Sequence, residues 1–140
     1  MQALPLRIPA GADLRDTLAA LPAAHGVAAA FVLQGIGSLS VARIRFAGAS
    51  DCTDLHGDLE ILSLGGSLSP DGPHLHIAVS DAQGRVTGGH MGPGCVVRTT
   101  AEVLVMLLPD QRFSREIDPA TGYKELYVAG PGDTQAGKAS

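Results

Sequence analysis

Basic and aromatic side chains are scarce in this sequence. Ten lysines and arginines stand against fourteen aspartates and glutamates, which gives a formal net charge of −4 at pH 7. The aromatic residues are three Phe and two Tyr, with no Trp. Neutralised phosphates supply much of a protein's affinity for DNA, and aromatic rings stack on single-stranded bases. Direct, tight DNA binding by this chain alone is therefore not expected.

Cysteines and long apolar runs are also few. Cys52 and Cys95 form no C-x-x-C motif, so we expect two free thiols in a reducing compartment. The longest apolar runs, Val27–Leu33 and Val103–Leu108, are far shorter than a membrane span. The first fifteen residues do not resemble a secretory signal. These absences predict a cytoplasmic protein with no membrane partner.

Glycine is abundant, with 18 residues, and the apolar pattern is mostly that of strands. Asp13 is the predicted cap of a helix that runs to about His25, and Gly35-Ile36-Gly37 is predicted to break the chain between two strands. The predicted strands are Leu4–Ile8, Val27–Leu33, Leu39–Phe46, Leu59–Leu68, His74–Ser80, Val86–Met91, Cys95–Leu108 and an irregular pair within Gln111–Val128. We therefore expect one α/β (α+β) domain over residues 1–128, mainly an antiparallel sheet flanked by helices, and a disordered tail over 129–140.

Three of the five histidines lie within seventeen residues, as His74, His76 and His90. Residues two apart in a strand point to the same face, so His74 and His76 project together. If Ala82-Gln83-Gly84 is a three-residue hairpin loop with Gly84 in the left-handed conformation, every pair of facing residues sums to 166. His76 then lies opposite His90, and all three imidazoles share one face.

Glycines leave an alternative open. A bulge at Gly88-Gly89 would shift the register by one residue and turn His90 to the other face. Alternatively, the same two glycines clear space near the site. A count through the turn Pro70–Pro73 places Gly66 near His76, where it would leave the face open. We therefore regard Gly66 and Gly89 as possible ligand-binding positions.

Three imidazoles suit a transition metal. Zinc is the expected ion, with nickel, copper and iron as alternatives. Three protein ligands leave one coordination position open, as in catalytic zinc sites. A lone histidine on a strand is usually only a surface residue. An H-x-H pair with a third histidine placed opposite by the turn is much less frequent by chance. Counts through the turns place Glu60 near Ala82 and Glu102 near Gly84, about 20 Å along the strands from His76. No general base is predicted beside the histidines.

The sequence resembles the PPC domain, named for plant and prokaryote conserved. The motifs that carry the resemblance, over residues 5–128, are Gly35-Ile36-Gly37-Ser38-Leu39, Gly57–Gly66, His74-Leu75-His76-Ile77, Gly84–His90, Thr99–Val103, Phe113-Ser114-Arg115, Thr121-Gly122-Tyr123 and Glu125-Leu126. The resemblance implies a homotrimer. It also implies that His74, His76 and His90 match the metal ligands of prokaryotic members. Members are often labelled DNA-binding, but the Arg-Gly-Arg-Pro core of the plant AT-hook is missing here.

A more distant similarity is to the acetolactate decarboxylases, which bind zinc through an H-x-H motif and a later histidine. That class also needs an Arg and Glu residues around its metal, and Arg115 is the Arg that we nominate as a possible ligand-binding residue. Three functions follow as expectations. The chain is a trimeric zinc-binding module of unassigned role, a zinc-dependent lyase or hydrolase for a small oxo acid, or a DNA-associated protein that acts through partners.

Overall fold

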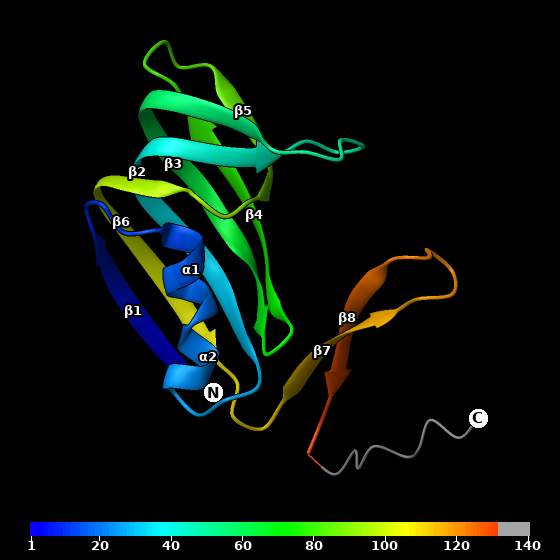
Figure 1. Cartoon of the computed structure of the whole chain (residues 1–140). Helices are drawn as coiled ribbons and strands as arrows, with labels where there is room; N and C mark the ends of the chain where they lie inside the picture. Colours follow the sequence, from blue (N-terminus) through cyan, green and yellow to red (C-terminus); the bar gives the residue numbers. More distant parts are fainter. Residues whose placement is uncertain (132–140) are drawn as a thin grey trace.

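The computed structural model describes residues 1–131, which form one six-stranded sheet, two short helices and a separate two-stranded hairpin (Figure 1). The elements in chain order are β1 (Gln2–Pro9), α1 (Leu14–Ala19), α2 (Leu21–Ala24), β2 (Ala30–Arg45), β3 (Thr53–Ser69), β4 (Gly72–Ser80), β5 (Val86–Met91), β6 (Val96–Leu107), β7 (Arg112–Ile117) and β8 (Lys124–Ala129). The sheet order is β1-β6-β2-β3-β4-β5, with a further pairing of β2 with β5, and β7 pairs with β8.

The fold is largely β, so the predicted α/β class is wrong while the mainly antiparallel sheet is confirmed. All pairings between the named strands are antiparallel. Antiparallel neighbours can be joined by short turns, whereas parallel strands need long helical crossovers. These strands can therefore be connected without helical crossovers, and the two helices, α1 and α2, are short, with six and four residues.

The predicted helix from Asp13 to His25 is divided in two. Its start is as expected, because the Asp13 side chain accepts a hydrogen bond from the Asp16 N–H at 2.9 Å. Ala20 ends α1 and precedes α2, where Pro22 stands in the first turn, the position that proline tolerates best in a helix. Leu14 and Leu18 are fully buried, so α1 closes the core on one face of the sheet.

The central strand β2 is one strand of sixteen residues, although the sequence predicted two strands with a break at Gly35-Ile36-Gly37. Gly37 has φ +135°, which lets the chain bend without leaving the sheet. A Cβ at this position would overlap the carbonyl oxygen of Thr100 on β6. The glycine thus permits close contact between β2 and β6. The next strand, β3, begins at Thr53, before the predicted strand start at Leu59.

The far end of β2 curls the sheet round onto its last strand. Ile44 and Arg45 pair with Met91 and His90 of β5. Side chains on the inner face of the curled sheet make the core, and the largest fully buried ones are Leu14, Leu18, Leu39, Ile44, Leu64, Leu68, Leu75, Leu107, Val32, Val79, Val97 and Val105. Cys95 is buried and Cys52 half-buried, and both are free thiols as predicted.

The β7–β8 hairpin extends away from the curled sheet (Figure 1). Its base is anchored by Phe113, which is buried and whose N–H donates to the Ala28 carbonyl at 3.0 Å. The predicted strand pair within Gln111–Val128 is confirmed, as β7 and β8. Strand β8 ends at Ala129, and residues 132–140 of the predicted tail lie outside the described residues. Within residues 1–131, no helix is long and apolar enough to cross a membrane.

Replacement of Gly37 by alanine should destabilise the protein more than replacement of Gly57. Both glycines lie in strands at similar positive φ, +135° and +126°, but a Cβ at Gly57 would meet nothing within 4 Å. Gly57→Ala should lower the free energy of unfolding by about 1–3 kcal/mol through backbone strain alone. Gly37→Ala should lose a further ~1–3 kcal/mol from overlap with Thr100. Urea unfolding at one protein concentration measures the free energy of unfolding of both variants. Equal decreases would show that close contact between β2 and β6 does not require a glycine at position 37.

Candidate metal centre

The turn between β4 and β5 sets the register of the two strands that carry the histidines. The Asp81 N–H donates to the Arg85 carbonyl at 3.0 Å, and Gly84 has φ +77°. His76 pairs with His90 and Val79 with Thr87, so facing residues sum to 166 as predicted. The alternative register, with a bulge at Gly88-Gly89, is wrong because pairing continues through both glycines.

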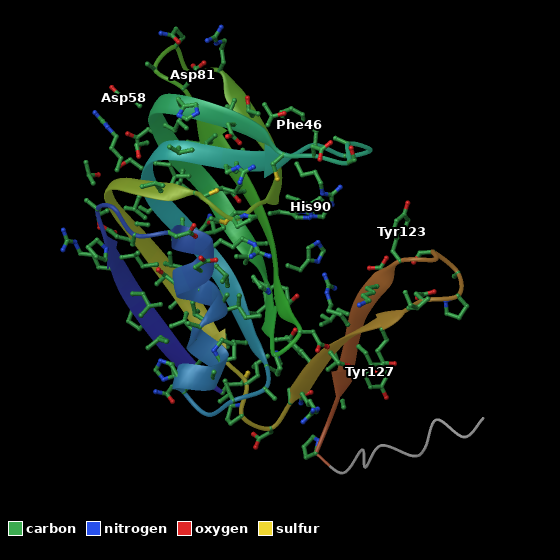
Figure 2. The ribbon with its side chains drawn as sticks, viewed as in Figure 1. Phe46, Asp58, Asp81, His90, Tyr123 and Tyr127 are labelled. Atoms are coloured by element: carbon green, nitrogen blue, oxygen red, sulfur yellow. The ribbon has the colours of Figure 1, made fainter. Side chains whose placement is uncertain are left out.

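The three histidines lie together on the outer face of the curled sheet. Leu75 and Ile77 are 2% and 3% exposed, and point into the core, so alternation along β4 turns His74 and His76 outward. The ring centroids of His74 and His76 are 5.1 Å apart, those of His74 and His90 5.1 Å, and those of His76 and His90 4.5 Å. One nitrogen from each ring lies within 4.8 Å of the others. Figure 2 shows His90 directed into the space between the sheet and the β7–β8 hairpin.

The surroundings favour the neutral form of two of the imidazoles, those of His74 and His90. Burial, followed by the positive charge of Arg115, lowers the pKa of His74 to about 4. Burial and the charge of Arg45 lower the pKa of His90. A metal binds the free electron pair of a neutral imidazole, so ligands must be unprotonated. The donor set therefore fits a transition-metal ion held by three nitrogens.

A pocket of about 560 Å³ opens beside His74 and His76. Its other lining side chains belong to β2, β3 and the β7–β8 hairpin, and are Phe31, Val32, Leu33, Ser63, Gly65, Gly66, Ser67, Arg115, Glu125 and Leu126. The structure thus brings the nominated Arg115 to the histidines. It also brings Glu125, which the sequence analysis did not place there. The pairing of β7 with β8 is local, but the position of this hairpin over β3 and β4 depends on contacts that no pattern in the sequence encodes.

The hairpin is held over the pocket by its backbone. The Arg115 N–H donates to the Asp71 carboxylate at 2.8 Å, which ties β7 to the β3–β4 turn. Arg115 and Glu125 are both half-buried. Glu125 accepts a hydrogen bond from the Thr121 hydroxyl at 3.2 Å within the hairpin's own turn. Two opposite charges therefore face the pocket from one hairpin.

Gly66 and Gly89 occupy structural positions that differ from those expected. The β3–β4 turn is one residue shorter than the count assumed, so Gly66 lies opposite Leu75 and Gly65 opposite His76. A Cβ on Gly66, at φ +143°, would overlap the His74 carbonyl oxygen, so this glycine lets β3 and β4 approach. A Cβ on Gly89 would lie 2.6 Å from the Arg45 carbonyl oxygen, so this glycine lets β5 approach β2. Gly66 borders the pocket, whereas Gly89 does not line it.

The two strand carboxylates are also not where the turn counts placed them. Glu60 faces Ser80 and not Ala82, because the β3–β4 turn is one residue shorter than assumed and a register shift between Ile61 and Ser63 adds one more residue. Glu102 faces Arg7 of β1 and Ile36 of β2. The count to Gly84 was wrong because β6 does not pair with β5, its predecessor in the chain, but with β1 and β2.

A family model for the Plants and Prokaryotes Conserved (PCC) domain matches residues 1–109. The chain belongs to this family. The match confirms the resemblance to the PPC domain, and its range ends before β7, so Arg115 and Glu125 lie beyond it. Among solved structures, a hypothetical protein from Salmonella enterica is 40% identical with a TM-score of 0.88, covering 92% of this chain and 94% of that one.

Two further proteins are similar to this chain over most of its length. A protein from Archaeoglobus fulgidus described as metal-containing is 26% identical with a TM-score of 0.76, covering 91% of this chain and 94% of that one. The bifunctional protein GlmU of Synechococcus sp. strain JA-3-3Ab is 48% identical over 128 residues, which is 91% of this chain and 21% of that protein. The chain thus spans about one fifth of the length of the curated relatives that it matches.

Proposed function

We propose that this PCC domain is a metal-binding module that holds one divalent transition-metal ion through His74, His76 and His90. The observation that carries the proposal is the convergence of three imidazole nitrogens within 4.8 Å. Zinc is the ion we expect, because neutral nitrogen donors suit it and no thiolate belongs to the cluster. The metal-containing relative from Archaeoglobus fulgidus supports a metal in this family.

Three protein ligands leave a coordination position for water or a small molecule, and the adjoining pocket gives such a molecule access. When bound, a zinc ion can polarise a carbonyl or lower the pKa of its water. The residues of the chain would contribute binding and orientation. Phe31, Leu33 and Leu126 offer apolar surface, and Arg115 and Glu125 offer charge.

We also propose that the domain works as a homotrimer. The outer face of β2 leaves large apolar side chains in water, with Leu33 and Ile36 each 51% exposed. Leu104 of β6 and Tyr127 and Val128 of β8 are exposed as well. Apolar surface of this extent is typical of a face covered by another subunit. Because the chain has one such face on the sheet and another on the hairpin, a closed ring of copies can bury both.

A zinc-dependent lyase or hydrolase for a small oxo acid is the second candidate. The observation that favours it is that Glu125 and Arg115 border the pocket of the histidines. A carboxylate beside a metal site can accept or return a proton, which contributes typically 10²–10⁴-fold to a rate. In this function Glu125 would be the general base and Arg115 would orient the acid.

Charge pairing argues against direct DNA binding. Arg43, Arg85 and Arg98 form ion pairs with Asp54, Asp81 and Asp58 at 2.8, 2.7 and 2.9 Å. Arginines that already face carboxylates are poorly placed to neutralise phosphates. An association with DNA would then depend on partners, as the acidic composition indicates.

Elemental analysis of the untagged protein, purified without chelators, should find about one zinc per chain. The double variant His76→Ala/His90→Ala should contain none, since one imidazole cannot hold the ion. His56→Ala is the matched control, because His56 is an exposed strand histidine outside the cluster, and it should keep its metal. Lack of metal in the unchanged protein, even after zinc is added back, would refute the metal-binding module.

Incubation of the zinc-loaded protein with a panel of small 2-oxo and 3-oxo acids tests the enzyme candidate, with products followed by NMR. Turnover should stop on chelation. Glu125→Gln should reduce it about 100-fold or more while the zinc content stays unchanged, because the variant removes a proton acceptor and not a ligand. A loaded protein that consumes none of these acids would leave the non-enzymatic module as the function.

Light scattering should give a mass three times that of the 14.3 kDa chain. Ile36→Asp should shift the protein towards monomer, because it places a charge on the apolar face of β2. Val86→Asp is the control. Val86 is 60% exposed beside the β4–β5 turn, away from that face, and its replacement should leave the mass unchanged. A monomeric mass for the unchanged protein would rule out the trimer.

A further inference from the structure

The guanidinium of Arg115 is the starting observation. It lines the pocket beside His74 and His76, it is half-buried, and within residues 1–131 no ion pair or hydrogen bond is formed by its side chain. Its charge is close enough to both His74 and His90 to lower their pKa values. A guanidinium that is partly removed from water and lacks a protein partner is suited to receive an anion from outside.

The position of this guanidinium is determined by the fold. The backbone N–H of Arg115 is bonded to Asp71 at 2.8 Å, and two residues earlier Phe113 is buried and bonded to Ala28. Strand β7 is therefore tied at two points, on the β3–β4 turn and beside the end of β6. Because the backbone is held, little conformational freedom is lost when the side chain meets a ligand, and such preorganisation favours binding.

We infer that the pocket selects a small carboxylic acid whose carboxylate pairs with Arg115 while a second oxygen, on the neighbouring carbon, reaches the metal held by the three histidines. The inference rests on the proposed metal site and names the class of molecule that the site takes. Arginine presents two parallel N–H donors that match the two oxygens of a carboxylate. The β7–β8 hairpin is thus the part of the chain that chooses the ligand.

The other lining residues favour a carboxylate over a phosphate. Among residues 1–131, one arginine and no lysine line the pocket, and Glu125 adds a negative charge that would repel the second charge of a phosphate. Phe31, Leu33 and Leu126 would pack on a short apolar group, and the Ser63 and Ser67 hydroxyls border the same space. These features together describe a small 2-hydroxy or 2-oxo acid with an aliphatic end.

Calorimetric titration of the zinc-loaded full chain tests the inference, with 2-hydroxybutyrate, its uncharged amide 2-hydroxybutyramide, and inorganic phosphate as probes. The acid should bind at least about tenfold more tightly than the amide or phosphate, since hydrogen bonds to a charged group are the stronger ones. Arg115→Gln should weaken binding of the acid roughly tenfold to a hundredfold, and Arg115→Lys should weaken it less. Arg112→Gln, on the same hairpin but outside the pocket lining, is the matched control and should leave the affinity unchanged.

Zinc content and melting temperature, measured for every variant, separate the possible failures. Zinc missing from the unchanged protein would refute the proposed metal site and this inference with it. A loaded protein that binds acid and amide equally, or that binds the acid unchanged in Arg115→Gln, would overturn the inference and leave the metal site standing. Phosphate binding as tight as that of the acid would overturn the choice of a carboxylate. If Arg115→Gln changes the melting temperature, Arg115→Lys decides the question, because lysine keeps the charge and loses the paired donors. Unchanged affinity of Arg115→Lys for the acid would then overturn the pairing of the carboxylate with the guanidinium.

Discussion

The antiparallel pairing of β4 with β5 is the constraint on which the site depends. The Asp81–Arg85 turn fixes which residues face each other, and alternation along β4 then separates Leu75 and Ile77 in the core from His74 and His76 outside. A shift of one residue would bury imidazoles and expose leucine and isoleucine. The burial of apolar side chains on one face therefore also secures the arrangement of the histidines on the other.

Close approach of backbones shapes the sheet around that pair of strands. Gly37, Gly66 and Gly89 lie where β2 meets β6, β3 meets β4, and β5 meets β2, and each has a carbonyl oxygen where a Cβ would stand. These contacts let the long strands curl until the far end of β2 pairs with β5, the last strand of the sheet. The curled sheet encloses the core, so only two short helices are needed to complete it.

The β7–β8 hairpin gives the site its chemical character. Without it, three histidines would stand on an open face of the sheet. With it, Arg115 and Glu125 border a pocket that apolar side chains also line. The backbone hydrogen bonds from Arg115 to Asp71 and from Phe113 to Ala28, together with the buried ring of Phe113, hold the hairpin beside the β3–β4 turn. Metal binding and ligand selection thus come from different parts of the fold.

The sequence by itself determined most of the strands, the capped helix start at Asp13, and the facing of His76 and His90, because all of these follow from local periodicity and one tight turn. Most of its wrong predictions concern residues whose neighbours lie far along the chain. The unbroken β2, the place of β6 beside β2, and the true role of Gly89 depend on long-range pairing, whereas Gly66 was misplaced because the β3–β4 turn is one residue shorter than assumed. Only the tertiary structure decided that Glu125 lies beside the histidines. The physical reason is that the local pattern of a strand determines which face of the sheet a side chain occupies. The packing of strands that are distant in the chain determines which residues lie against that face.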